Sequence, residues 1–192
     1  MPNPLIYRAQ INQAIIELIQ GDITKQSTDA IVNAANSSLL GGGGVDGAIH
    51  RAAGPELLAE TRTLGGCQTG DAKITRGYKL AAKFVIHTVG PVYQPRDTFV
   101  PQQLASAYRR SMELAEANNI QTISFPSIST GAYGYPVEEA APIALKTVID
   151  YVIEHDHFEH IVFVLFSEQI VEIYAQALTR LKQLHPDRIK AI

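Results

Sequence analysis

Residues 33–50 read NAANSSLLGGGGVDGAIH: the end of a strand runs into four consecutive glycines and then into the start of a helix. Gly41–Gly44 carry no Cβ and tolerate positive φ, so their amides can converge on an anion at the N-terminus of the following helix. This order of elements predicts a phosphate-binding loop. The alternative is a flexible turn, because glycine runs also occur in loops that bind nothing.

Polar side chains flank the glycine run. Asn33 and Asn36 bracket the end of the predicted strand, and Asp46 lies at the start of the predicted helix. Asp46 can cap that helix or carry a carboxylate into the cleft, and the two roles are compatible. We therefore expect amide and carboxylate groups beside the phosphate loop.

A second glycine-bearing loop, SISTGAYGYP at residues 127–136, also lies between a predicted strand and a predicted helix. Ser129, Thr130, Gly131 and Gly134 can donate hydrogen bonds to a diphosphate, and Tyr133 can close over a sugar. The alternative is a turn with a core tyrosine. Neither loop has the Gly-Lys-Ser/Thr of a P-loop, and no G-x-G-x-x-G opens the first β-α unit. These absences argue against γ-phosphate hydrolysis and dinucleotide redox chemistry.

Strand-like and helix-like stretches alternate along the chain. β-Branched and aromatic runs predict strands at residues 14–19, 30–35, 83–89, 122–126 and 161–166. Amphipathic spacing predicts helices at residues 45–54, 55–64, 104–115, 137–154 and 168–184. The alternation predicts a three-layer α/β domain with a largely parallel sheet, which binds ligands beyond the carboxyl ends of its strands. Pro142 predicts that its helix starts late. We also expect residues 93–101 to form a surface loop and the tail after Pro186 to be frayed.

Length and composition predict one globular domain over residues 1–192. The predicted strands and helices set its core at about 14–184, after a short N-terminal extension. Hydrophobic residues make up 46% and charged residues 18%, and the net charge of −3 argues against a nucleic-acid or anionic-lipid surface. No apolar run is long enough to cross a bilayer, and the N-terminus lacks a signal-peptide core. We therefore expect a soluble, cytoplasmic protein that binds no membrane.

Other titratable residues are expected to carry no chemistry. His155, His157 and His160 form an H-x-H-x-x-H cluster, but it lies at a polar helix end far from the glycine loops in sequence, so we expect solvated side chains and no metal. His50 and His87 are expected to be structural or supporting residues, and the lone Cys67 to be unreactive.

Five motifs resemble the macrodomain family and occur in its order over about residues 14–184: GDIT (21–24), NAAN with the glycine run, VDGAIHRAAGP (45–55), HTVGP (87–91) and STGAYGYP (129–136). The chain is most similar to the MacroD-like branch, which contains bacterial O-acetyl-ADP-ribose deacetylases. The resemblance implies a three-layer α/β/α fold with a mixed, mostly parallel central sheet. It also implies an ADP-ribose site that needs no cofactor and no metal.

The resemblance assigns roles to the binding motifs. Asp22 would hydrogen-bond the adenine amino group, and Phe166 would lie against the adenine ring. Ile23, next to Asp22, would also be a substrate-binding residue. Without the resemblance, Asp22 would be interpreted as a turn or cap residue and Phe166 as core packing. The diphosphate would be wrapped by both loops, namely by Gly41, Gly42, Gly43, Gly44, Val45, Ser129, Thr130, Gly131, Ala132 and Tyr133. Ala132 replaces a branched aliphatic residue usual in the family, which predicts looser packing against the diphosphate.

Asn36, Asp46 and Tyr133 would form the reacting end of the site. Asn36 would hold the distal ribose, Asp46 would activate or orient a water, and Tyr133 would seal the ribose and align the ester. The expected function is hydrolysis of O-acetyl-ADP-ribose to ADP-ribose and acetate, with mono-ADP-ribosyl esters on acidic side chains of proteins as a further substrate class. One alternative is a non-catalytic ADP-ribose reader. Another is an RNA-associated regulator, and the net charge of −3 argues against this second alternative.

Overall fold

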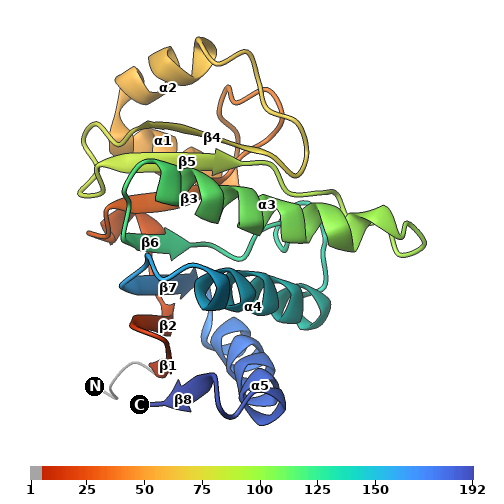
Figure 1. Ribbon diagram of the computed structural model, residues 1–192. Helices are drawn as coiled ribbons and strands as arrows, with labels where there is room; N and C mark the ends of the chain where they lie inside the picture. The colour runs from red at the N-terminus through yellow and green to blue at the C-terminus, as the bar shows by residue number, and fades with distance from the viewer. Residues whose placement is uncertain (1–5) are drawn as a thin grey trace.

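Eight strands form one mixed sheet in the order β4-β5-β3-β6-β7-β2-β1-β8 in the computed structural model, which describes residues 6–192 (Figure 1). The central strands run parallel: β5 (Phe84–Thr88), β3 (Ala30–Ala34), β6 (Thr122–Phe125), β7 (His160–Leu165) and β2 (Ala14–Gln20). The others pair antiparallel: β4 (Ala72–Arg76), β1 (Tyr7–Ile11) and β8 (Ile189–Ala191). The predicted mixed, mostly parallel sheet is confirmed.

Helices cover both faces of this sheet (Figure 1). One face carries α3 (Phe99–Ala117), α4 (Val137–Glu154) and α5 (Glu168–Leu184). The other carries the 3-10 helix η1 (Ile23–Lys25), α1 (Gly44–Ala53) and α2 (Pro55–Arg62). In β7, Ile161 and Phe163 belong to the apolar cluster with α3–α5, whereas Val162 and Val164 belong to the cluster with α1 and α2. A strand that is apolar on both faces needs a helical layer on each side, which gives the three layers.

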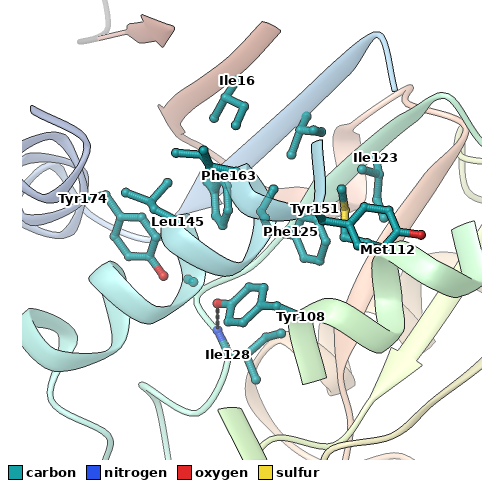
Figure 2. Close-up of a cluster of buried hydrophobic side chains, with 14 of the residues drawn as sticks. Ile16, Tyr108, Met112, Ile123, Phe125, Ile128, Leu145, Tyr151, Phe163 and Tyr174 are labelled. Carbon is teal, nitrogen blue, oxygen red and sulfur yellow. Dashed lines mark hydrogen bonds between the residues drawn. The ribbon is translucent and has the colours of Figure 1, made fainter. Parts of the chain in front are cut away.

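Aromatic rings fill the core between the sheet and helices α3–α5 (Figure 2). Phe125 and Phe163 stack with their ring centroids 5.6 Å apart, and the Tyr108 ring lies 5.5 Å from Phe125. Tyr174 of α5 packs 5.6 Å from Phe163. These contacts fix α3 and α5 against β6 and β7. The carboxyl ends of these two strands lead into the second glycine-bearing loop and into Phe166.

The structure corrects two predicted helix boundaries. Helix α4 begins at Val137 with Pro142 inside it, so the predicted late start is wrong. Pro142 removes only the bond to the carbonyl of Glu138, an exposed residue in the first turn whose carbonyl water can satisfy. Helix α3 begins at Phe99, so the predicted surface loop of residues 93–101 ends at residue 98, three residues earlier than predicted. Pro101 lies in the first turn of α3, where its missing N–H would have had no helical partner.

The sheet extends beyond the predicted core of residues 14–184. Residues 189–191 form β8, so the predicted frayed tail is wrong for this segment. Ile189 and Ala191 pair with Ile11 and Ala9 of β1, and Ile189 is 3% exposed. The side chain of Ile189 therefore anchors the end of the chain to the core.

The carboxyl ends of the parallel strands lie along one edge of the sheet. The loops that follow β2, β3, β5, β6 and β7 begin at Gly21, Ala35, Val89, Pro126 and Phe166. Ligands of parallel sheets bind at this edge. All the motifs singled out in the sequence except VDGAIHRAAGP begin in or next to one of these loops. Within residues 6–192, no helix combines the length and the apolar character needed to span a membrane.

Candidate functional site

A cavity of about 280 Å³ opens at the carboxyl ends of β3, β5 and β6. Residues of both glycine-bearing loops contribute to its wall. The lining comprises Ala34, Ala35, Asn36, Gly42, Gly43, Gly44, Val45, Asp46, Gly90, Ser127, Ile128, Ser129, Gly131, Ala132 and Tyr133. The fold thus brings together at one cavity the side chains of Asn36, Asp46 and Tyr133, which the sequence analysis placed at the reacting end.

The glycine-rich loop lies directly on the first turn of α1. A Cβ at Gly47 would lie 2.6 Å from the carbonyl oxygen of Gly42, so only glycine permits this approach. A Cβ at Gly42 would lie 3.1 Å from Oδ2 of Asp46 and 3.2 Å from Nδ2 of Asn36. The absence of a side chain at Gly42 therefore leaves open the space that the carboxylate and the amide share.

The side chain of Asn36 orders the loop that leads into the glycines. Its Nδ2 donates to the carbonyl of Gly41 at 2.9 Å. Its Oδ1 accepts from the backbone amide and the hydroxyl of Ser38 at 3.2 and 2.6 Å. The amide nitrogen carries two hydrogens, and the bond to Gly41 uses one of them. The other can be donated to a molecule in the cavity.

Asp46 is a buried carboxylate in the first turn of α1, with 5% of its surface exposed. Its Oδ1 accepts from Nδ2 of Asn33 at 2.8 Å and lies 3.3 Å from Nε2 of His50, one helical turn away. Its Oδ2 is the oxygen that faces Gly42. The N-cap residue is Gly43, which makes no side-chain cap bond, so Asp46 is not the N-cap residue.

A buried chain of hydrogen bonds holds Asp46 from behind. Nδ2 of Asn33 also reaches Nδ1 of His87 at 3.1 Å, and Nε2 of His87 reaches Oγ1 of Thr75 at 2.9 Å. Because Nδ2 of Asn33 can only donate, His87 accepts at Nδ1 and carries its proton on Nε2. Burial, together with the neighbouring His50, lowers the pKa of His87 to about 3, so its ring is neutral at neutral pH.

The orientation of the Asn33 amide follows from these partners. The reversed amide would set its oxygen against Oδ1 of Asp46, and two acceptor oxygens cannot form a hydrogen bond. Both amide hydrogens are therefore committed, one to each neighbour. We call Asn33, Asn36, Asp46 and His87 the carboxylate end of the site.

Ser129, the third residue of the second loop, has a sparsely populated backbone conformation. Its φ is +66°, and its buried hydroxyl has no partner among residues 6–192. A Cβ at Gly90 would lie 2.2 Å from this hydroxyl, so the glycine of HTVGP makes room for it. A buried hydroxyl without a partner is costly unless a ligand or a water satisfies it. This hydroxyl is therefore a donor available at the cavity wall.

The remaining predicted loop residues have different surroundings. Thr130 and Gly41 lie outside the cavity lining: the Thr130 hydroxyl donates to a carbonyl of its own loop at 3.0 Å, and the Gly41 carbonyl accepts from Asn36. The carbonyl of Tyr133 accepts from the amide of Tyr93 at 2.9 Å. The core tyrosine of this loop is Tyr135, which is 3% exposed, so Tyr133 is left to line the cavity.

Asp22 and Phe166 lie outside the cavity at the neighbouring ends of β2 and β7. Phe166 is 90% exposed, so the alternative that it packs in the core is wrong. The amide of Gly21 donates to the carbonyl of Leu165 at 3.1 Å, which places the residues after the two strands next to each other. We call Asp22 and Phe166 the aromatic end of the site.

Asp22 caps η1, as its alternative interpretation predicted. Its Oδ1 accepts from the hydroxyl of Thr24 at 2.7 Å and from the amide of Thr24 at 2.9 Å. These two hydrogen bonds lower the pKa of Asp22. Neither bond uses Oδ2, so capping leaves one carboxylate oxygen for a ligand. Ile23 is 5% exposed and packs in the apolar cluster with α1 and α2, so its side chain does not reach the cavity.

Part of the site was not predicted. Asn33 was expected as an amide beside the phosphate loop and His87 as a structural or supporting residue, but the β3–β5 register that places them opposite each other was not foreseen. Gly90, Ser127 and Ile128 line the cavity although no role was predicted for them. A polar residue in an otherwise apolar strand singled out Asn33 and His87, but their pairing depends on the strand register.

The other titratable residues lie in separate surroundings. The three clustered histidines have different partners: His155 lies 3.1 Å from Glu116, His157 lies 2.9 Å from the carbonyl of Ile120, and His160 lies 3.4 Å from Glu17. In the described part of the chain, no group of three His, Cys, Asp or Glu side chains is placed to hold a metal ion. Cys67 is buried, and burial raises the pKa of its thiol, which lowers its reactivity.

Comparison with known proteins identifies the family. The family model for the Macro domain matches residues 32–144. The chain is 53% identical to the O-acetyl-ADP-ribose deacetylase of Salmonella newport, over 86% of this chain and 94% of that protein. It is 54% identical to the ADP-ribose glycohydrolase MACROD2 of Xenopus laevis, over 88% of this chain and 42% of that protein. A structure of the Oceanobacillus iheyensis macrodomain with ADP is similar at a TM-score of 0.91 and 46% identity, covering 95% of this chain and 99% of that one. The chain belongs to the macrodomain family.

Proposed function

We propose that this protein binds ADP-ribose and hydrolyses the acetyl ester of O-acetyl-ADP-ribose, releasing ADP-ribose and acetate. The observation that carries the proposal is the buried Asp46, whose Oδ1 is held by Asn33 while its Oδ2 faces Gly42 at the cavity. The Salmonella relative is named as a deacetylase of this ester. The Oceanobacillus structure contains ADP, which has the adenine and the diphosphate of ADP-ribose.

The two glycine-bearing loops form the diphosphate site in this proposal. Amides of Gly42–Gly44 lie at the N-terminus of α1, where the helix dipole and unpaired N–H groups favour an anion. The unpartnered hydroxyl of Ser129 adds a donor from the second loop. At the aromatic end, the exposed ring of Phe166 offers a face to adenine, and Oδ2 of Asp22 can accept from its amino group.

Ester hydrolysis would take place at the carboxylate end. A water oxygen attacks the acetyl carbon, the bond from that carbon to the ribose oxygen breaks, and the ribose oxygen gains a proton as acetate leaves. Oδ2 of Asp46 orients the water by accepting one of its hydrogens, while Asn36 donates to the distal ribose. Because a carboxylate is a weak base at neutral pH, we assign Asp46 mainly an orienting role, with a substrate phosphate as a further proton acceptor.

Mono-ADP-ribosyl esters on acidic side chains of proteins form a second substrate class. They present the same kind of ester on the distal ribose, and the Xenopus relative is named as an ADP-ribose glycohydrolase. Ala132 is exposed at the rim of the cavity and Tyr133 beside it is half-buried. Tyr133, which is assigned to the distal ribose, is therefore not enclosed by the protein, which leaves room for an acyl group larger than acetyl.

Calorimetric titration with ADP-ribose, followed by product analysis of O-acetyl-ADP-ribose, tests the proposal. We expect wild type to bind ADP-ribose and to release acetate. Asp46→Ala should lower turnover on the order of 100-fold, while the Kd for ADP-ribose stays within about tenfold, which corresponds to about 1.4 kcal/mol. Asp187→Ala, which removes an exposed carboxylate after α5, is the matched control and should change neither quantity.

Each other outcome has a distinct meaning. Binding without acetate release would make the protein a reader of ADP-ribose. Equal losses of binding and turnover in Asp46→Ala would make Asp46 a binding residue. A wild-type protein that binds no ADP-ribose would refute both the site and the activity.

A further inference from the structure

The second loop is held from inside the core by a tyrosine of α3. The hydroxyl of Tyr108 accepts from the backbone amide of Ile128 at 3.0 Å and donates to the carbonyl of Pro126 at 3.3 Å. Tyr108 and Ile128 are both 0% exposed, and Figure 2 shows the hydroxyl directed at the Ile128 amide. One hydroxyl therefore satisfies two backbone groups of the loop that have no access to water.

A tyrosine of α5 contacts the same segment. The hydroxyl of Tyr174 donates to Oγ of Ser127 at 2.8 Å, and its ring packs against Phe163 in the aromatic cluster. Residues 126–128 are thus hydrogen-bonded to side chains of two helices that are far apart in the sequence. Burial raises the pKa of both tyrosines, so both hydroxyls keep their protons in neutral solution.

Neither tyrosine lines the cavity, but the residues that they hold do. Ser127 and Ile128 lie in the cavity wall, and Ser129 follows with its φ of +66° and its unpartnered hydroxyl. A residue keeps such a conformation only when its surroundings fix it. A loop that is fixed before the ligand arrives loses less entropy on binding, which raises the affinity.

We propose that Tyr108 and Tyr174 are positioning residues, which hold residues 126–128 so that Ser129 presents its donors to the diphosphate. The inference rests on the proposed function, since the loop is useful only if a diphosphate binds there. Tyr108 carries the larger share because it satisfies buried backbone groups. Ser127 is half-buried, so a water molecule can hydrogen-bond its hydroxyl when the hydroxyl of Tyr174 is removed.

The test is the binding of ADP-ribose and of adenosine to Tyr108→Phe and Tyr174→Phe in the full chain. Adenosine has no phosphate, so it reports on the aromatic end alone. Tyr108→Phe should weaken ADP-ribose binding on the order of tenfold and Tyr174→Phe about threefold, while adenosine binding changes less than about twofold in either variant. Amide hydrogen exchange at Ile128 should become faster in Tyr108→Phe, because its acceptor is lost.

Tyr151→Phe is the matched control. Tyr151 is a buried tyrosine of α4 whose hydroxyl donates to Glu116, away from the second loop. The Tyr151→Phe substitution should lower the melting temperature without changing the affinity for ADP-ribose or for adenosine. Equal losses of ADP-ribose affinity in all three variants would overturn the inference, because they would show a general loss of packing. If Tyr108→Phe bound ADP-ribose with the wild-type affinity, the inference would be overturned and the proposed function would stand. If the wild type bound no ADP-ribose, the proposed function would be overturned as well.

Discussion

The carboxylate end and the aromatic end of the site are built in opposite ways. At the carboxylate end, Asp46 is 5% exposed, and Asn33 and His87 behind it are buried with defined donor and acceptor roles. At the aromatic end, Phe166 is 90% exposed. The difference follows from what each end has to do in the proposed function. A reacting water must be aimed by a rigid group, whereas a base can be bound by an open aromatic face.

The two ends also differ in how a ligand would change them. Oδ1 of Asp46 has its partners without a ligand, so its geometry is preset. The ring of Phe166 is in water until a base covers it, so the gain from burying apolar surface arises only on binding. Substitutions at the carboxylate end should therefore act mainly on turnover, and substitutions at the aromatic end mainly on affinity.

After Asp46→Ala itself, the largest effect is expected from Asn33→Leu, which should lower turnover to a similar extent. Leucine is close to asparagine in size but donates to neither Oδ1 of Asp46 nor Nδ1 of His87, so the carboxylate loses its support. We expect kcat to fall on the order of 100-fold, or about 2.7 kcal/mol in activation free energy, with the Kd for ADP-ribose within about threefold. Steady-state kinetics and calorimetry on the same preparation measure the two quantities.

Ser124→Ala is the control for Asn33→Leu. Ser124 is 0% exposed in β6 and hydrogen-bonds Thr28 at 2.8 Å, outside the cavity lining. Its loss should lower stability and leave kcat unchanged. Parallel losses of kcat and affinity in Asn33→Leu would remove the distinction between the two ends.

The next effect is a pH dependence of stability at the carboxylate end. The folded protein keeps His87 neutral down to a pKa of about 3, whereas an unfolded histidine titrates near 6.5. Between these values the unfolded state binds one proton more, so the contribution of His87 to stability is full above pH 6.5 and falls as the pH drops toward 3. Between pH 6 and 4.5 the loss should amount to about 2 kcal/mol.

Denaturant unfolding of wild type and His87→Gln at a series of pH values measures this contribution. Glutamine can accept from Asn33 and donate to Thr75 without titrating, so the variant should lose the slope that is due to His87. His185→Gln removes a histidine exposed after α5 and should keep the wild-type slope, because His87 remains. An unchanged slope in His87→Gln would show that His87 takes a proton in the folded state.

The sequence predicts the central sheet well and its edges poorly, and the reason is the strength of the local pattern. β3, β5, β6 and β7 are apolar on both faces, so composition alone identifies them. β4 and β8 are short edge strands, and β1 is a short strand between β2 and β8. All three have mixed burial, and β8 has a single buried residue, Ile189. Pro142 is misleading because a helix tolerates proline where the lost bond belongs to an exposed first turn.

The site divides in the same way. The two glycine-bearing loops and Asp46 are recognisable from the local sequence, and residues of all three line the same cavity. The pairing of Asn33 with His87 depends on the register of β3 and β5, which no local pattern specifies. The exposure of Phe166 also depends on tertiary structure, because an aromatic residue at the end of an apolar strand is more often buried. Only the resemblance to the macrodomain family predicted its role.

Phe166→Ala should affect affinity without affecting turnover. Stacking on a base contributes roughly 1–3 kcal/mol, so we expect about a tenfold weaker Kd for ADP-ribose with kcat within about twofold. Stability should change little, since the ring is 90% exposed. Phe99→Ala is the matched control, because Phe99 is also exposed, at 67%, but lies outside the cavity and the aromatic end. Similar losses in both variants would show that the effect does not come from stacking at the aromatic end.

The smallest effect is expected from Asp22→Ala. Oδ2 of Asp22 is the proposed acceptor for the adenine amino group, and a single hydrogen bond to an exposed carboxylate should contribute about threefold in affinity, or about 0.7 kcal/mol. Calorimetry with ADP-ribose and with its hypoxanthine counterpart, which lacks the amino group, measures this preference. Wild type should prefer the adenine form, and Asp22→Ala should not. Thr24→Val removes one donor to Oδ1 but keeps the carboxylate, so it should retain the preference. A preference that persists in Asp22→Ala would confine the role of Asp22 to capping η1.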